Sequence, residues 1–311
     1  WRTSSSEGEP QRPHTQLGVV LNQGARTGRA APPASYHLRK KLIPMLDAPL
    51  LVLVDLETTE AAPVPTGPSL ELLTAARDLT SGDVVALALQ PLGEAASAAL
   101  AGAGATRLLS ADLGEAAHLP ATAADDVVAA VGAVQPAAVL VVSDYRGKEL
   151  AGRAAVLLGS ACVSDVTALE ASGSGSDSEL RASKLVLSGS WSTTASVGSG
   201  GSAPIIALRP GIAEVAAAEG APLTAEPLEV PVSAEAAAVR LVSRDATSVA
   251  SGPALTEART VFVGRRGLDG AFDLVCSLAP PLGPSVRFSP LAPHYLLNSS
   301  RPQNRQPPSH D

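Results

Sequence analysis

Aromatic residues are scarce in this chain. Its 311 residues include three Phe, three Tyr and two Trp, or 3%, although 45% of the residues are hydrophobic. A core of Ala, Val and Leu suits helices packed on a parallel sheet, because the strands of such a sheet read as continuous aliphatic runs. The composition therefore favours an α/β fold, and the length allows about two domains of roughly 100–200 residues.

Long apolar runs and cysteine clusters are also missing. No run approaches the roughly 18 apolar residues of a membrane-spanning helix, so we expect no membrane span. Cys162 and Cys276 lie far apart, and neither has a CxxC neighbour. We therefore expect two buried thiols, with no disulfide and no metal site. We interpret His118 as exposed and without a role, and we find no triad, P-loop or carboxylate pair that would supply catalytic residues.

Basic residues are concentrated at the two ends of the chain. Residues 1–45 carry seven Lys or Arg against two Glu, and residues 284–311 carry three Arg against one Asp. The formal net charge of −7 therefore leaves −14 on residues 46–283. An acidic body disfavours nucleic acid and anionic membranes as partners, and we expect neither.

Residues 1–44 lack a sustained hydrophobic period, and we expect a disordered leader. They also lack the charged, apolar and small-residue succession of a secretory signal. The only methionine, Met45, stands directly before the first convincing strand pattern. This position suggests that the original protein starts at Met45 and that the leader is additional sequence.

From Leu46 onward, aliphatic strand patterns alternate with helix patterns. Strands are expected at 51–56, 84–89, 106–112, 136–143, 162–169, 184–191 and 203–211, and helices at 69–79, 93–104, 123–134 and 147–159. Ser69 is the candidate N-cap of the first helix. Residues 172–178 are expected to form a hairpin-like loop, and 228–232 and 239–243 to be extended and close the domain. The alternation predicts a mostly parallel sheet flanked by helices.

Three stretches have the composition of ligand loops. At 143–149 a strand end meets a helix start with Lys148 and Glu149 in its first turn, where α/β sheets place ligands. A solvated first turn is the alternative there, and the residues favour it. GSGGS at 198–202 precedes a strand pattern and is expected to be a turn. In GRRG at 264–267 the glycines permit close backbone approach, and Arg266 can meet a phosphate or an anionic ring.

The order of these segments resembles the alpha subunit of electron-transfer flavoproteins. LLVLVDL and SLELLTAARDL are similar to the family's opening strand and helix, and VLVVSDYRGKELAGRAAVLLGSACVSDV to its central signature. IIALRPG resembles a later strand, and VPVS…VRLVSRD…GPALTEARTVFVGRRGL the segment between its two domains. The resemblance runs from about Leu50 to about Gly283.

This resemblance implies a nucleotide-binding-like first domain and a second, doubly wound FAD domain. It implies an electron carrier rather than an enzyme that turns over a substrate, in complex with a beta subunit. Electrons would come from flavin dehydrogenases and go to a membrane quinone reductase. FAD would lie mainly in the second domain and AMP in the beta subunit, while the first domain docks that subunit. The implied location is the cytoplasm, or the mitochondrial matrix in a eukaryote.

The family's FAD loop carries over onto Gly264, Arg266 and Gly267, with Arg266 contacting the cofactor. Ser289 takes the place of a later flavin-site serine, but Pro290 stands where the family has arginine. Later flavin motifs do not occur, so we expect a truncated FAD domain. The expected organisation is a leader (1–44), the first domain (45–243), a linker (244–259), the start of the FAD domain (260–283) and a disordered tail (284–311).

Two other functional hypotheses stay open. In the first, the chain is a flavin-free α/β module that docks a beta-like partner. In the second, it is an inert gene remnant. The proline-rich composition of the tail also fits sequence read from an unrelated frame or intron.

Overall fold

The computed structural model describes residues 46–58, 62–173, 179–198, 202–215 and 220–243, and the backbone of three further strands, 17–20, 261–264 and 285–288. The chain divides into two units, Trp1–Val242 and Ser243–Asp311, which we describe separately. No helix among the described residues is long and apolar enough to cross a membrane.

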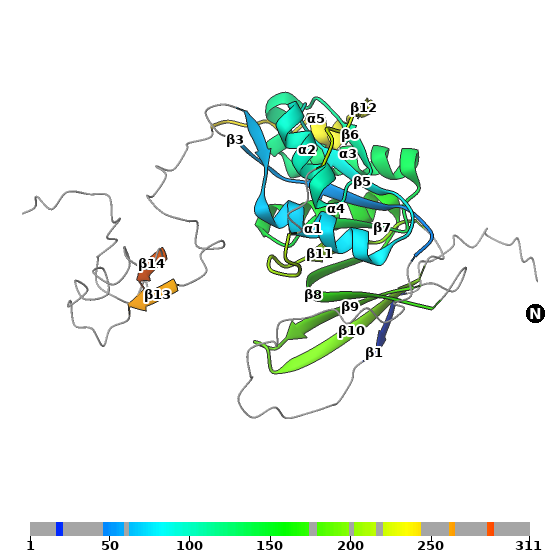
Figure 1. Ribbon diagram of the computed structural model, residues 1–311, viewed down its shortest axis with the longest axis vertical. Helices are drawn as coiled ribbons and strands as arrows, with labels where there is room; N and C mark the ends of the chain where they lie inside the picture. The colour runs from blue at the N-terminus through cyan, green and yellow to red at the C-terminus, as the bar shows by residue number, and fades with distance from the viewer. Residues whose placement is uncertain are drawn as a thin grey trace, which may run out of the picture. The chain divides into compact units, whose positions relative to one another are not determined.

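A ten-stranded sheet runs through the described part of the first unit (Figure 1), in the order β1-β10-β9-β8-β11-β7-β2-β5-β6-β12. Its parallel part consists of β2 (Leu50–Val54), β5 (Val84–Ala88), β6 (Arg107–Ser110), β7 (Ala138–Val142), β8 (Cys162–Ser172), β11 (Ile205–Leu208) and β12 (Ala225–Pro227). Beyond β8, an antiparallel part adds β9 (Glu179–Val186), β10 (Trp191–Gly198) and β1 (Leu17–Val20). The expected α/β class with a mostly parallel sheet is confirmed.

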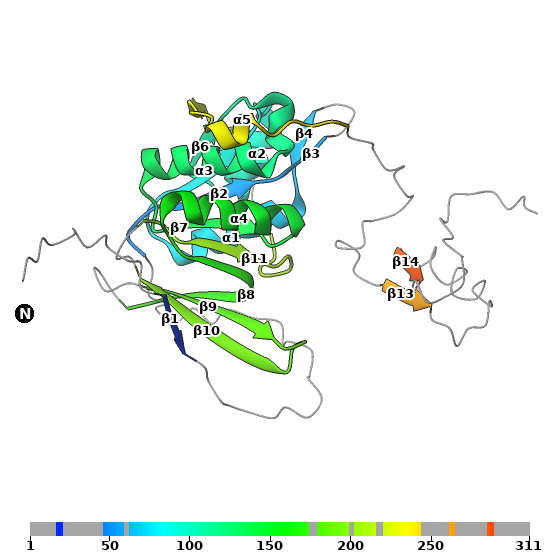
Figure 2. The ribbon, with the colours of Figure 1, turned by 180° about the vertical axis from the view of Figure 1, so that it is seen from behind.

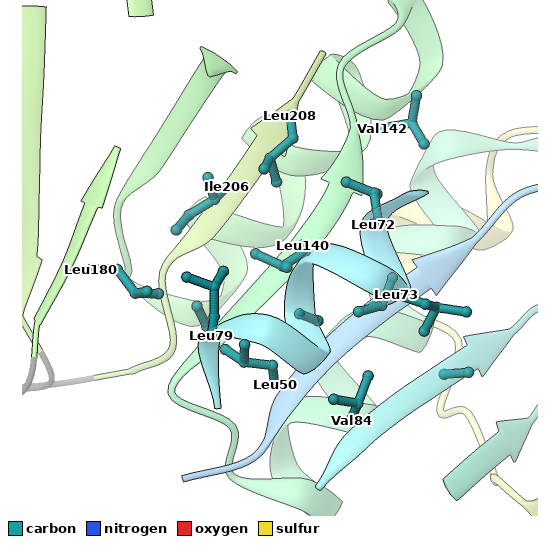
Figure 3. Packing of buried hydrophobic residues seen from close by; sticks show 14 of the residues in the cluster. Leu50, Leu72, Leu73, Leu79, Val84, Leu140, Val142, Leu180, Ile206 and Leu208 are labelled. Atoms are coloured by element: carbon teal, nitrogen blue, oxygen red, sulfur yellow. The ribbon is translucent and has the colours of Figure 1, made fainter. Parts of the chain in front are cut away.

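Helices cover both faces of the parallel strands (Figure 2). α1 (Gly67–Leu79) and α2 (Glu94–Ala103) pack on one face, and α3 (Pro120–Val134) and α4 (Tyr145–Leu158) on the other. The alternation of strand side chains divides the core accordingly. Leu50 and Val52 of β2 join the cluster that includes Leu72 and Leu73 of α1 (Figure 3), whereas Leu51 and Leu53 join the cluster on the α3–α4 side.

The central strands are aliphatic because neither of their faces meets water. Every residue of β2, β5 and β7 is buried. Burial of a Val or Leu side chain stabilises the fold by about 1.5–3 kcal/mol relative to its exposure. The loss of alternation between apolar and polar residues in these strands is therefore the sequence pattern of a doubly covered sheet.

The first helix begins earlier than its sequence suggests. Thr66, not Ser69, is the N-cap of α1, and its side chain accepts a hydrogen bond from the Ser69 amide at 3.3 Å. Ser69 is instead fully buried, and its hydroxyl accepts a hydrogen bond from the Asp55 amide at 2.9 Å. The prediction of Ser69 as the cap was wrong, because its hydroxyl ties the helix to the end of β2.

The expected strand at 184–191 was also wrong. Its middle is the tight turn between β9 and β10, and the backbone takes left-handed φ values at Leu187 (51°), Ser188 (55°) and Gly189 (84°). Small residues mark such turns, but the aliphatic pattern of residues 184–187 masked the signal.

Residues 225–242, which we name the C-terminal belt, form the last part of the first unit. The belt contains β12, whose pairing with β6 places it at the sheet edge, and one helical turn, α5 (Ala234–Ala237), packed on α3. Residues 228–232 and 239–243, which we expected to be extended, form neither helix nor ladder strand; the described strand lies before them at 225–227, and Ser233 caps the helical turn between them.

Shorter elements complete the description. β3 (Leu56–Thr58) and β4 (Pro63–Pro65) pair with each other, and η1 (Gly114–His118) precedes α3.

We expected no regular structure in the leader or in the tail, but four residues of the leader form β1. In the second unit, β13 (Val261–Gly264) pairs in parallel with β14 (Ser285–Phe288), which lies within the expected tail.

Candidate functional site

The first unit has one topological switch point in its described strands, between β2 and β7. From β2 the chain passes to β5 and β6 on one side, and then returns to add β7 on the other side of β2. The helices that follow, α1 and α4, lie on opposite faces of the sheet. In open α/β sheets, ligands bind in the crevice that such a reversal opens at the carboxyl ends of the strands.

An ion pair of the chain itself spans this switch point. Arg146, at the start of α4, donates from Nη1 to Oδ1 of Asp55, which directly follows β2. Its Nη2 donates to the carbonyl oxygen of Ala117 in η1. Both charged side chains are only 20% exposed. The guanidinium therefore links β2, η1 and α4 where a ligand would otherwise enter.

The charge balance at the switch point is unfavourable for an anion. Burial raises the pKa of Asp55, Arg146 opposes that rise, and the nearby carboxylate of Asp144 adds to it. Two carboxyl groups thus lie near one guanidinium, whose Nη1 and Nη2 are already bonded while its buried Nε has no hydrogen-bond partner. An added phosphate would meet like charge from both carboxyl groups.

The amino end of α4 is also closed to an anion. Asp144 is the N-cap, and its Oδ1 accepts a hydrogen bond from the Gly147 amide at 2.6 Å. A helix amino terminus binds phosphate through such free amides. Here the chain's own carboxylate uses one, and a Cβ on residue 147 would lie 1.9 Å from the Val142 carbonyl oxygen. The described residues of this crevice therefore do not fit a dinucleotide.

The charged residues of the stretch 147–149 (Gly-Lys-Glu) have partners within the chain. Lys148 Nζ lies 2.8 Å from Asp165 Oδ1, and Arg153 pairs with Glu149 one helical turn earlier at 3.0 Å. α4 begins at Tyr145, so Lys148 and Glu149 fall in its second turn and not, as expected, in its first. Lys148 and Glu149 thus pair within the chain and are partly exposed, which fits a solvated segment better than a ligand loop.

A polar cluster links the ends of three neighbouring parallel strands. Asp165 in β8 accepts hydrogen bonds from Lys148 and from the Ser143 hydroxyl (3.3 Å), and Arg209 Nε lies 3.5 Å from its Oδ1. These contacts, chiefly the one with Lys148, hold the pKa of Asp165 below its ordinary value. Asp165 has a left-handed φ of 60°, at a point where the register of β8 shifts.

In the second unit, one predicted flavin residue, Gly264, stands at the carboxyl end of a strand pair. Gly264 ends β13 and is paired with Phe288, the last residue of β14, so Ser289 follows next in the chain. The intervening residues 265–284 are long enough for the crossover that two parallel strands require. Carboxyl ends of adjacent parallel strands are where α/β folds bind cofactors.

The sequence of the first unit matches a known family model. The model described as "Electron transfer flavoprotein domain" matches residues 56–247. The chain belongs to the electron transfer flavoprotein family.

Curated members of this family are similar over most of their length. "Electron transfer flavoprotein subunit alpha" of Mycobacterium leprae (strain TN) is 36% identical over 226 residues, which cover 71% of this chain and 67% of that protein. The proteins of the same name from Mycobacterium tuberculosis strains CDC 1551 / Oshkosh and ATCC 25618 / H37Rv are 35% identical over the same shares. The resemblance to the alpha subunit is therefore confirmed.

Several residues singled out in this electron transfer flavoprotein chain lie outside the described residues. They include Arg266, Gly267, Ser289, Pro290 and Cys276, and the middle of the 198–202 turn. Two expectations were wrong in detail. His118 is half-buried at the end of η1 rather than exposed, and Cys162 is half-buried rather than buried. Among the described residues, no group of three or more His, Cys, Asp or Glu could hold a metal.

Sequence reasoning missed the residues that close the switch point of this flavoprotein domain. Neither Arg146 nor Asp55 was singled out, although one follows the end of β7 and the other the end of β2. An acidic residue directly after β2 and a basic residue in the first turn of the helix after β7 were the available signal. Reading that signal requires knowing that β2 and β7 are neighbours.

Proposed function

We propose that this chain acts as the alpha subunit of an electron transfer flavoprotein. It accepts electrons from flavin dehydrogenases and delivers them to a quinone reductase, through FAD held in complex with a beta subunit. The match of residues 56–247 to the family model carries this proposal. The GRRG loop, which follows β13 in the second unit, supports it further.

FAD supplies the redox chemistry of this function, and the chain orients and tunes it. We assign its binding to Gly264, Arg266, Gly267 and Ser289. Gly264 ends β13, where a residue without a Cβ lets the backbone approach a ligand closely. The Arg266 guanidinium donates hydrogen bonds in a fixed plane, and its charge favours the anionic parts of the cofactor.

The first unit serves as the scaffold that docks the beta subunit. Its core is complete on both faces of the sheet, and its own ion pair spans the switch point between β2 and β7. A domain of this kind keeps its shape without a cofactor. The family resemblance assigns AMP to the beta subunit.

The same closed switch point is equally compatible with a second candidate function. A chain whose described crevice does not fit a dinucleotide can act as a flavin-free module that docks a beta-like partner. The two functions share the first unit and differ in whether the second unit holds flavin.

A visible absorption spectrum of the chain co-purified with a beta subunit separates them. A flavin band that co-migrates with both subunits supports electron transfer. A stable, colourless complex supports the docking module and contradicts the electron carrier. Failure to bind the beta subunit contradicts both functions.

A further inference from the structure

One carboxyl group in the core has no hydrogen-bond partner. Asp126 of α3 is 0% exposed, and neither of its carboxyl oxygens has a partner. It lies one turn from Ala123 and Ala130, which belong to the apolar cluster on that face of the sheet. An unpartnered carboxylate in such surroundings is costly, whereas a protonated carboxyl is much less so.

No neighbouring charge compensates Asp126 within the described residues. α3 packs against α4, η1, α5 and β2. Their titratable or charged side chains are Tyr145, Arg146, Lys148, Glu149 and Arg153 of α4, Glu115 and His118 of η1, and Glu235 of α5, while β2 has none. Arg146 pairs with Asp55, Lys148 with Asp165, and Arg153 with Glu149. Burial alone raises the pKa of Asp126 from 3.8 to about 7.

The adjacent residue on α3 holds the C-terminal belt. Asp125 Oδ2 accepts a hydrogen bond from the Ser233 amide at 2.7 Å. The Ser233 hydroxyl in turn caps α5 by accepting from the Ala236 amide, and Ala236 is buried. α5 and its attachment to α3 thus depend on the position of residue 125, next to the buried carboxyl.

We propose that the protonation state of Asp126 controls how firmly α3 holds the belt. With its proton, Asp126 stays in the core and keeps Asp125 in place to bind Ser233. Without it, the carboxylate gains by reaching water, and it does so by loosening the turn of α3 that carries Asp125. Because the belt is the last part of the first unit, pH then sets the attachment of the segment leading out of that unit. This inference does not depend on the proposed electron-transfer function.

The direction of the pH effect follows from the two protonation equilibria. In the unfolded or loosened state the carboxyl titrates near its ordinary value of 3.8, and in the folded state near 7. The folded state therefore binds the extra proton between these values. The stability that this proton gives the folded state over the loosened state is complete below about pH 4 and is lost as pH rises toward 7. The opening equilibrium constant increases about tenfold per pH unit across this range.

Amide hydrogen exchange between about pH 5 and pH 8 tests this coupling. The probe is the Ser233 amide, and the internal control is the Leu228 amide of the same belt, which donates to Ser110 of β6 and not to α3. After correction for intrinsic exchange, Ser233 protection should fall by at least about tenfold up to pH 7, because opening releases one proton. Leu228 protection should change little.

The Asp126→Asn variant decides whether the carboxyl is responsible. Its side chain has nearly the same shape but no titration, so Ser233 protection should no longer depend on pH. Equal pH dependence in both proteins, or Leu228 following Ser233, would overturn the proposal. Carbon-13 titration of Asp126 in the unsubstituted protein is an independent check. A midpoint below about pH 5 would also overturn it, even if the variant does not fold.

Discussion

Two glycines of α4 have opposite surroundings. A Cβ on Gly147 would lie 1.9 Å from the Val142 carbonyl oxygen, whereas one on Gly152 would meet no atom within 4 Å. The clash at Gly147 involves backbone, which cannot move without displacing β7. Gly147 therefore fixes the tight passage from β7 into α4 that brings Arg146 to Asp55.

We expect Gly147→Ala to lower the free energy of unfolding by at least about 1–3 kcal/mol, the usual cost of overpacking. Gly152→Ala is the matched control. It should raise the free energy of unfolding by about 0.5–1 kcal/mol, since alanine favours a helix more than glycine does. Urea unfolding measures both. Similar changes in the two variants would refute the close contact at Gly147.

Asp165 contributes stability through its charge rather than its shape. In Asp165→Asn the left-handed backbone is still tolerated. The variant should be less stable at neutral pH by about 1 kcal/mol or less, because Lys148 and Asp165 are partly exposed. The folded-state pKa is lowered, so this stability is present above about pH 4 and is lost as pH falls further. Denaturant unfolding of both proteins at pH 7 and near pH 3 checks the direction of this pH dependence. A stability difference between them that grows on acidification contradicts the prediction.

At the scale of elements, the β9–β10 turn is suboptimal. Leu187 and Ser188 both have positive φ values, which Asn and Gly tolerate better than Leu and Ser do. Replacing the pair by Asn-Gly should stabilise the protein by about 1 kcal/mol, because β-carbon crowding is relieved and the lost Leu187 side chain is already 70% exposed. Thermal unfolding measures the gain. Ser190→Gly, outside the positive-φ run, should not stabilise, and an equal gain there would contradict the argument.

Elements were predictable where the sequence pattern is local. The central strands and the four long helices were expected within a few residues, because doubly covered strands are continuously aliphatic and the helices have marked ends. The β9–β10 turn was missed because aliphatic residues run into it. The helical turn α5 was not expected, because the position of its cap Ser233 depends on a contact with Asp125, far away in sequence.

The candidate site was less predictable for the same reason. The glycine loop at 264–267 is visible as a motif, since its residues are contiguous. Asp55 and Arg146, by contrast, are 91 residues apart and meet only because β7 is added beside β2. Ser143, Asp165 and Arg209 likewise come together through the order of β7, β11 and β8.

At the scale of the whole molecule, the two units carry different parts of the proposed function. The first has a filled core and a closed switch point, so it requires no flavin to fold. The second contributes the residues that we assign to FAD. Flavin content should therefore depend on the GRRG loop. Arg266→Ala should weaken the affinity for flavin by at least about tenfold, as expected for the loss of a charge-assisted hydrogen bond of about 1.5–3 kcal/mol.

The most direct test is the amount of flavin released per chain from the complex with a beta subunit. Three proteins are compared: the unsubstituted chain, Arg266→Ala, and Arg265→Ala as the matched control from the same loop. The account predicts close to one flavin per chain in the unsubstituted and Arg265→Ala complexes, and a marked loss in Arg266→Ala. A complex without flavin in the unsubstituted chain, or equal flavin in all three, would contradict it.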